Sequence, residues 1–146
     1  MIDLHTHTNC SDGTDSPREL VNKAIVLGLE VLGISDHDTT SGWKEATETL
    51  RGSLKLALGS EISCLTTDGV SVHMLGLLFD SEHAEIQQVL EETRDGRLPR
   101  MRKMIEKMRA EGMDISMEDV EQAMPAGATM GRPHLADALV AKKIVK

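Results

Sequence analysis

The chain has 146 residues, 40% of them hydrophobic, a length and composition that suit one folded domain with a buried core and argue against disorder. Twenty-four acidic against sixteen basic residues give a formal net charge of −8, which excludes nucleic-acid binding through bulk positive charge. Two cysteines, no signal-like leader and no apolar run of about eighteen residues exclude a disulfide framework and a membrane span, and we expect a cytoplasmic protein.

The chain begins with a short predicted strand that carries two histidines, Asp3-Leu4-His5-Thr6-His7. Residues i and i+2 of a strand share a face, so His5 and His7 should point their imidazoles at one place, as a pair of metal ligands does. Two unrelated histidines would give the same spacing. A loop of turn-forming residues is predicted from Thr8 to Asp15.

Helix and strand alternate over the next segments. Ser16 is a suitable N-cap for a helix that starts at Pro17 and ends near Gly28, with Glu19 completing the capping pattern. The other predicted elements are apolar strands over 31–35 and 54–58, a helix through 43–50 that closes near residue 52, and a strand over 70–79.

Histidines and carboxylates gather where these strands end. Five of them fall at or just past the carboxyl end of a predicted strand: His5, His7, Asp36, His37 and Glu61. In parallel α/β architectures that edge carries the active site. His73 falls early in its strand, and an antiparallel return after Asp68-Gly69 would bring it to the same edge. Imidazoles and carboxylates without cysteine suit zinc, iron or manganese, and a shared glutamate could bridge two ions.

Four short motifs follow one another over residues 1–80. They are Asp3-Leu4-His5-Thr6-His7 with Ser11-Asp12-Gly13, Ser35-Asp36-His37-Asp38, Gly59-Ser60-Glu61-Ile62 and Val72-His73-Met74-Leu75-Gly76. This series resembles the motifs of the polymerase and histidinol phosphatase (PHP) superfamily, and within it the stand-alone bacterial phosphoesterases of nucleotide phosphatase or exoribonuclease type. The resemblance implies an α/β fold, part of a distorted seven-stranded β/α barrel that holds two or three metal ions at its carboxyl edge.

The resemblance also implies a set of metal ligands, with Glu61 as the bridge between ions: His5, His7, Asp12, His37, Glu61 and His73. Asp12 could instead make only a local turn, and His73 could be a core histidine. Asp36 and Asp38 are interpreted as residues that orient a ligand or cap the following helix, as carboxylates next to metal ligands often do.

From Ser81 the alternation stops and helix follows helix. We predict helices over 81–93, 99–112, 116–124 and 132–140, with an interruption at Asp95-Gly96 and with Pro99 as the first residue of the second. The methionines along these helices are expected to pack in a core. By the resemblance, residues 81–146 are a helical insertion, or lid, over the metal site of residues 1–80.

One segment of this insertion, Gly131-Arg132-Pro133-His134, is similar to a family motif. A lid helix could bring Arg132 or His134 onto a substrate phosphate, because arginine offers a fork of donors that matches this anion, and we expect both residues to be catalytic. His134 could also be only a helix-start residue. A solvated helix face is expected for the basic run Arg97, Arg100, Arg102 and Lys103.

In the resembled family, the second half of the barrel supplies another histidine and an Asp-x-His pair to the metals, and no Asp-x-His occurs here after residue 80. We therefore expect the amino-terminal half of a barrel, with the barrel remainder absent from this chain. Such a half would leave strand edges and an apolar face open to self-association.

The sequence thus predicts a metal-dependent phosphoesterase that hydrolyses phosphate esters of nucleotides or oligonucleotide ends by a metal-activated water. The expected cofactors are two or three divalent ions, manganese, zinc or iron, and the expected partner is a small phosphorylated substrate. Two other classes stay open. One is a non-catalytic metal-binding module or fragment, and the other is a histidinol phosphatase or a metal-dependent hydrolase that cleaves a C–N bond.

Overall fold

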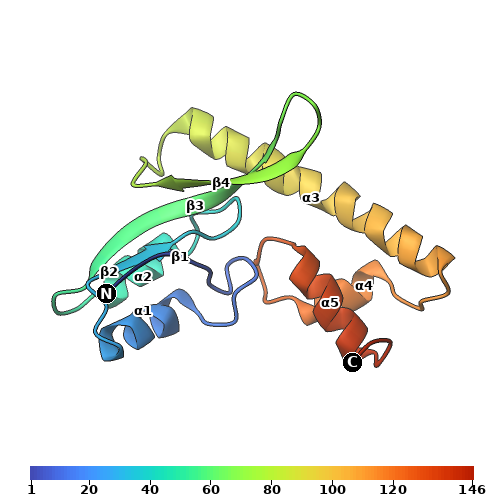
Figure 1. The fold of residues 1–146 in the computed structure, drawn as a ribbon, viewed down its shortest axis with the longest axis horizontal. Coiled ribbons are helices and arrows are strands. Elements are labelled where there is room, and N and C mark those ends of the chain that lie inside the picture. Colours follow the sequence, from blue (N-terminus) through green and yellow to red (C-terminus); the bar gives the residue numbers. More distant parts are fainter.

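The computed structural model describes residues 1–146, with four strands and five helices. One curled sheet in the order β1-β2-β3-β4 is built from β1 (Ile2–Thr6), β2 (Val31–Ile34), β3 (Lys55–Leu65) and β4 (Ser71–Leu77) (Figure 1). β1, β2 and the first part of β3 run parallel, as strands joined by helices do. The carboxyl ends of these strands therefore meet at one edge of the sheet.

β3 changes its hydrogen-bonding partner along its length. Residues 55–58 pair in parallel with β2, whereas residues 59–65 pair antiparallel with β4. The strand predicted to end at residue 58 therefore continues, because β4 folds back beside it and supplies new partners. The antiparallel return predicted for His73 is confirmed. Glu61 lies inside β3, three residues past Leu58, which is the last residue of the ladder to β2.

Two helices pack against the sheet: α1 (Pro17–Val26) lies below it in the view of Figure 1, and α2 (Trp43–Thr49) is drawn behind β1 and β2. α1 begins as the sequence predicts, because the Ser16 hydroxyl accepts from the Glu19 amide and the Glu19 carboxylate accepts from the Ser16 amide. Both helices contribute to a first hydrophobic core on β2: Val21, Ala24, Leu32, Ile34, Ala46 and Leu54.

The second half of the chain is helical, with α3 (Ala84–Ala110), α4 (Met117–Ala123) and α5 (Arg132–Ala141). The break predicted at Asp95-Gly96 is wrong, because α3 continues through it and contains Pro99. A glycine costs a helix only about 1 kcal/mol, and the buried side chains Leu90 and Met101 anchor α3 on either side. No helix, including the 27-residue α3, is apolar over a stretch that could cross a membrane.

A second hydrophobic core lies among these helices and shares no residue with the first. It consists of Met101, Ile105, Ile115, Val120, Leu135, Ala138 and Leu139. Six further methionines are partly buried against it, which confirms that the methionine stripe is core packing. The fold therefore has two packed bodies, and the carboxyl edge of the sheet faces the region between them (Figure 1).

The first core provides a test of the fold. Leu32 on β2 is 1% exposed and Leu27 at the end of α1 is 68% exposed. Leu32→Ala should lower the free energy of unfolding by about 2–5 kcal/mol because it leaves a cavity, whereas the matched change Leu27→Ala should cost less than about 0.5 kcal/mol. Urea unfolding followed by circular dichroism measures both. Equal costs for the two variants would contradict the described burial of β2.

Candidate metal centre

The Glu61 carboxylate is the centre of a cluster of histidines. Its Oε2 lies 2.8 Å from His5 Nε2 and 3.0 Å from His7 Nε2, and its Oε1 lies 2.6 Å from His73 Nδ1. A fourth ring nitrogen, His37 Nδ1, is 3.9 Å from Oε2. Residues from β1, β3 and β4 and from the segment after β2 thus converge on one carboxylate that is 8% exposed.

Asp12 extends this cluster on one side. Its Oδ1 is 3.4 Å from His7 Nδ1, and its Oδ2 is 3.4 Å from His37 Nε2. The loop that carries Asp12 folds back tightly, since the Gly13 amide donates to the Thr8 carbonyl at 2.9 Å. A Cβ at Gly13 would lie 2.3 Å from the His7 carbonyl oxygen, so only glycine permits this close return.

All six predicted metal ligands are therefore brought together. They form three overlapping groups whose ligand atoms lie within 4.8 Å of one another: His5, His7 and Glu61; His7, Asp12 and His37; and His37, Glu61 and His73. Imidazoles with carboxylates are the donors that first-row divalent ions take. His37 Nδ1 is buried without a hydrogen-bond partner, which is the state of a nitrogen whose ligand is a metal ion. The residues fit a site for divalent metal ions.

The ionisation of the carboxylates also suits metal binding. A hydrogen bond from His37 lowers the pKa of Asp12 to about 2. Burial by itself raises the pKa of Glu61, but hydrogen bonds from His5 and His73 outweigh burial and leave that pKa lowered. Both side chains therefore carry a full negative charge near neutral pH.

The two inner histidines differ in their protonation. Burial is the largest influence on His7 and lowers its pKa, against the opposing charge of Asp12. Burial also acts to lower the pKa of His37, but the hydrogen bond and charge of Asp12 outweigh it and raise the pKa. Burial thus favours the neutral, metal-binding form of His7, while Asp12 favours the protonated form of His37 through a contact that a cation would replace.

Asp36 holds the loop that carries Asp12. Its Oδ1 accepts from the Thr8 amide and from the Ser11 hydroxyl, both at 2.7 Å, and its Oδ2 accepts from the Thr8 hydroxyl at 2.7 Å. Asp36 is buried and no cation pairs with it, so the hydrogen bonds from these three donors compensate for the loss of solvation of its carboxylate. The sequence interpretation of Asp36 as a residue that orients a ligand agrees with this position.

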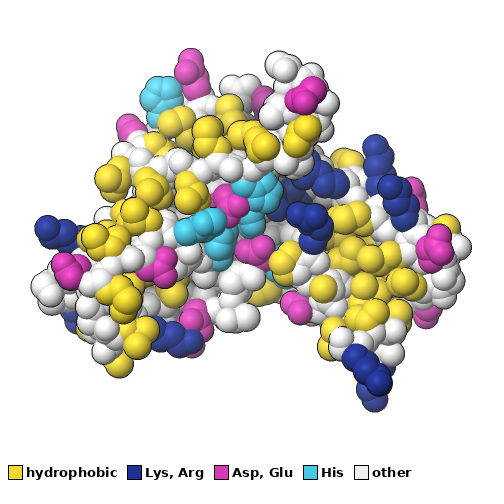
Figure 2. All heavy atoms as spheres, in the orientation of Figure 1, with side chains coloured by type: hydrophobic (Ala, Val, Ile, Leu, Met, Phe, Trp, Pro, Cys, Tyr) yellow, Lys and Arg dark blue, Asp and Glu magenta, His cyan; other side chains and the backbone are white.

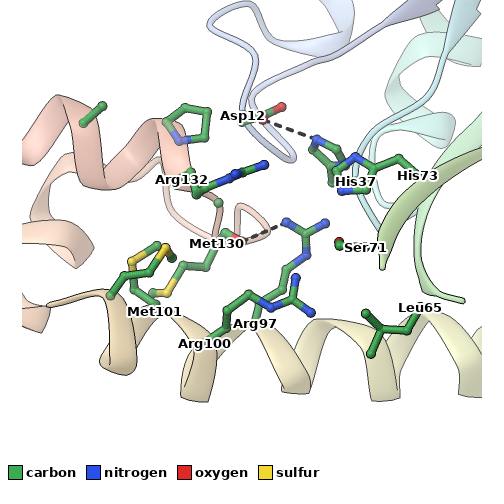
Figure 3. A pocket seen from close by; sticks show the side chains of 14 residues that line it. Asp12, His37, Leu65, Ser71, His73, Arg97, Arg100, Met101, Met130 and Arg132 are labelled. Atoms are coloured by element: carbon green, nitrogen blue, oxygen red, sulfur yellow. Dashed lines mark hydrogen bonds and ion pairs between the residues drawn. The ribbon is translucent and has the colours of Figure 1, made fainter. Parts of the chain in front are cut away.

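A cavity of about 920 Å³ opens beside the histidines. Asp12, His37 and His73 line one side of it, and the arginines of the helical segment, Arg97, Arg100 and Arg132, line the other (Figure 3). Figure 2 shows the same hollow from outside, with the histidines around a carboxylate and basic side chains next to them. The cavity therefore joins a metal-ligand cluster to a group of guanidiniums.

Arg97 is not part of a solvated face, and that prediction is wrong for this residue. Its side chain is 11% exposed, and its Nε and one terminal nitrogen lie 2.7 Å and 2.5 Å from Asp38 Oδ2. Asp38, predicted to orient a ligand or cap α2, is instead the partner of Arg97 and Ser63. A usable signal existed, because Arg97, Met101, Met104 and Met108 share one stripe of the helix.

The two residues predicted to be catalytic lie in different surroundings. Arg132 is exposed at the cavity wall, and it has neighbours in Arg97 and Arg100 that the sequence interpretation missed. His134 is 3% exposed, and its Nδ1 accepts from the Gly131 amide at 3.1 Å. Burial is the largest influence on the His134 pKa and lowers it. The structure thus places Arg132 beside the cluster, and His134 under the loop at the start of α5.

Similarity to known proteins extends over nearly the whole chain. The family model described as PHP domain matches residues 3–142. A 5'-3' exoribonuclease of Haemophilus influenzae is 33% identical over 139 residues, which are 94% of this chain and 50% of that protein. A 3',5'-nucleoside bisphosphate phosphatase of Chromobacterium violaceum is 31% identical, over 99% of this chain and 51% of that protein.

A solved structure matches the fold over the same extent. It is the crystal structure of a Bifidobacterium adolescentis protein classed as a metal-dependent phosphoesterase, with a TM-score of 0.87 and 43% sequence identity. The match covers 99% of this chain and 51% of that one. The chain spans about half the length of the curated relatives it matches.

The hydrogen bonds of Asp36 lead to a prediction about metal affinity. Asp36→Ala removes the acceptor of three donors and frees the loop that carries Asp12, so Mn²⁺ affinity should fall about 10–100-fold. Isothermal titration with Mn²⁺ measures the affinity. Asp114→Ala, at a side chain that is 98% exposed in the helical segment, is the control and should leave it unchanged. Equal affinities in both variants would mean that the loop does not depend on Asp36.

Proposed function

The chain belongs to the PHP domain family, and from this premise we propose that it takes part in the metal-dependent hydrolysis of phosphate esters. The predicted fold, part of a distorted β/α barrel followed by helices, is confirmed by the structural match. The observation that carries the proposal is the single cavity in which a histidine and carboxylate cluster faces three arginines. Residues 1–80 are proposed as the barrel part and residues 81–146 as its helical cover.

The proposed metal ligands are His5, His7, Asp12, His37, Glu61 and His73. Glu61 belongs to two of the three ligand groups and faces histidines with both carboxylate oxygens, as a bridging ligand does. Three groups suit two or three divalent ions, with manganese, zinc or iron favoured by the donors. When bound, such ions supply a Lewis acid for the phosphoryl group and lower the pKa of a water towards neutrality.

The protein's own contribution on the substrate side is cationic. Arg100 and Arg132 line the cavity, and no acidic side chain of the chain pairs with either. Free guanidiniums beside a metal-ligand cluster favour a substrate that carries phosphate, because the planar fork of donors matches phosphate oxygens. In this proposal Arg132 and Arg100 hold the phosphate, and His134 holds the start of α5 so that Arg132 faces the cavity.

The substrate class is proposed from the relatives. One is named for cleaving RNA from its 5' end and another for removing phosphate from a nucleoside bisphosphate. We therefore propose a nucleotide or the end of a short oligonucleotide as the substrate. The cavity of about 920 Å³ is large enough for a ligand of nucleotide size.

The metal ligands are tested with two histidine variants. Loss of a residue that only orients a metal ligand lowers metal affinity roughly 10–100-fold, and His7→Ala, which removes a proposed ligand, should lower Mn²⁺ affinity by more. The same variant should abolish any phosphate release from a 3',5'-nucleoside bisphosphate. The matched control is His83→Ala, because His83 is exposed before α3 and lies outside the cluster. Metal content by elemental analysis and phosphate release are measured together. Unchanged metal content in His7→Ala would contradict the ligand assignment.

The arginines are tested by phosphate binding alone. Arg100→Met and Arg132→Met should each weaken the affinity of the metal-loaded chain for inorganic phosphate about tenfold, the effect of losing one hydrogen bond to a charged group. Arg109→Met changes an exposed residue of α3, the helix of Arg100, away from the cavity, and should leave the phosphate affinity unchanged. Titration calorimetry with inorganic phosphate measures all three. If all three variants bind inorganic phosphate as tightly as the parent chain, phosphate does not bind at Arg100 and Arg132.

A further inference from the structure

The cavity lies between two bodies that have separate cores. The barrel body, residues 1–95, is built around the first core, and the helical body, residues 99–146, is built around the second. The histidine cluster belongs to the barrel body, whereas Arg100 and Arg132 belong to the helical body. The distance between the metal ligands and the phosphate-binding arginines is therefore set by how the two bodies are held together.

The covalent link between the bodies is the middle turn of α3. This turn contains Gly96 and Pro99, the two residue types that weaken a helix most. Pro99 has no amide hydrogen, so the carbonyl of Asp95 lacks its usual helical donor. Gly96 has no atom within 4 Å of its Cβ position, so this side of the helix is open. Helix bends occur at such sites, so this turn holds the angle between the bodies less firmly than an ordinary helical turn would.

Arg97 lies in this turn and makes the polar contacts that join the bodies. Two of its nitrogens donate to Asp38, one of these also reaches Ser63 Oγ at 2.7 Å, and the third donates to the Met130 carbonyl at 3.2 Å. Asp38 and Ser63 belong to the barrel body, and Met130 belongs to the segment just before α5. The bodies are also joined by the Thr129 amide, which donates to the Cys10 carbonyl at 2.8 Å, and by a hydrogen bond between His134 and the Ser11 backbone.

Asp38 depends on this contact. Its side chain is fully buried, and Arg97 is the cation that pairs with it. Its φ of 52° lies in the left-handed region, which Asp and Asn tolerate and most other residues do not. It follows His37 directly, so a shift of Asp38 would move a proposed metal ligand. A buried carboxylate that loses its cation is strongly destabilised, which holds Arg97 in place.

We propose that Arg97 is a positioning residue that clamps the helical body onto the barrel body through Asp38, and so sets the spacing between the metal ligands and the phosphate-binding arginines. Arg97 makes four contacts to the protein with its three nitrogens, which leaves one of its five N–H groups, so its main role is structural, whereas Arg100 and Arg132 have no acidic partner. Without the clamp, the middle turn of α3 becomes a hinge and the cavity loses its fixed width. The role in spacing rests on the proposed function, whereas the clamp itself does not.

The clamp is tested by the distance between the bodies. Spin labels are placed at two exposed positions, Asn22 on α1 and Glu121 on α4, in a chain whose Cys10 and Cys64 are replaced by serine. Double electron–electron resonance should give one narrow distance distribution for this parent. Arg97→Met should broaden and shift the distribution. Arg102→Met, an exposed arginine on the same helix, is the matched control and should leave it unchanged.

Two further variants separate the clamp from a general loss of fold. Arg97→Lys keeps the charge beside Asp38 but lacks the fork that reaches Ser63 and Met130, so its distribution should be intermediate. Asp38→Asn suits the left-handed backbone and removes the negative charge, and adding Arg97→Met to it should broaden the distribution no further. A distribution as narrow as the parent's in Arg97→Lys and in Asp38→Asn would overturn the proposal, whether or not Arg97→Met folds.

Ligand binding distinguishes failure of this proposal from failure of the proposed function. Mn²⁺ should still bind to Arg97→Lys, because Arg97 is not a metal ligand and lysine keeps a cation beside Asp38, while inorganic phosphate should bind more weakly than to the parent. A broadened distribution with unchanged phosphate affinity would keep the clamp and overturn its role in spacing. A parent chain that binds neither Mn²⁺ nor phosphate would overturn the proposed function, and the distance measurement would still decide on the clamp.

Discussion

The change of partner along β3 is the constraint on which the rest of the site depends. The ladder to β2 ends at Leu58, and beyond it an isolated bridge to His37 is what joins Glu61 to the segment after β2. Because residues 59–65 pair with β4, Glu61 sits on a regular strand beyond the end of β2, and His73 lies across from Ser63 on the neighbouring strand. Backbone hydrogen bonds thus hold the carboxylate and one imidazole, and the ends of β1 and β2 bring the others to them.

Negative charge is buried at three places around this centre, and each is compensated differently. Asp36 is satisfied by neutral donors from the loop that it holds, and Asp38 is satisfied by a guanidinium from the other body. Glu61 is surrounded by imidazoles, which are equally good partners for a cation. Only at Glu61 could the partners turn from a carboxylate to a metal ion without leaving a buried charge unpaired, which supports the proposal of metal ligands there.

The sequence was informative where chemistry depends on local spacing. His5 and His7 one residue apart and Ser16 with Glu19 each predicted a feature that the structure contains, because strand alternation and capping involve only near neighbours. The prediction from sequence failed at Arg97, because its partner Asp38 is fifty-nine residues away. It also failed at the middle of α3, because burial of Leu90 and Met101 outweighs the unfavourable helix propensity of Gly96 and Pro99. Contacts between distant segments leave no periodic signal, so charge alone suggested a solvated face.

The net charge of −8 and the arginine-lined cavity act at different ranges. At physiological salt the Debye length is about 8 Å, so the acidic surface beyond the cavity repels an incoming phosphate only weakly. Inside the cavity, close to low-dielectric walls, the proposed phosphate-binding residues Arg100 and Arg132 would act on a phosphate with little screening. An overall acidic chain can therefore select an anion, provided that its few free cations lie together at one site. Arg100 and Arg132 lie on the helical body, so their position beside the histidine cluster depends on how that body is held over the sheet.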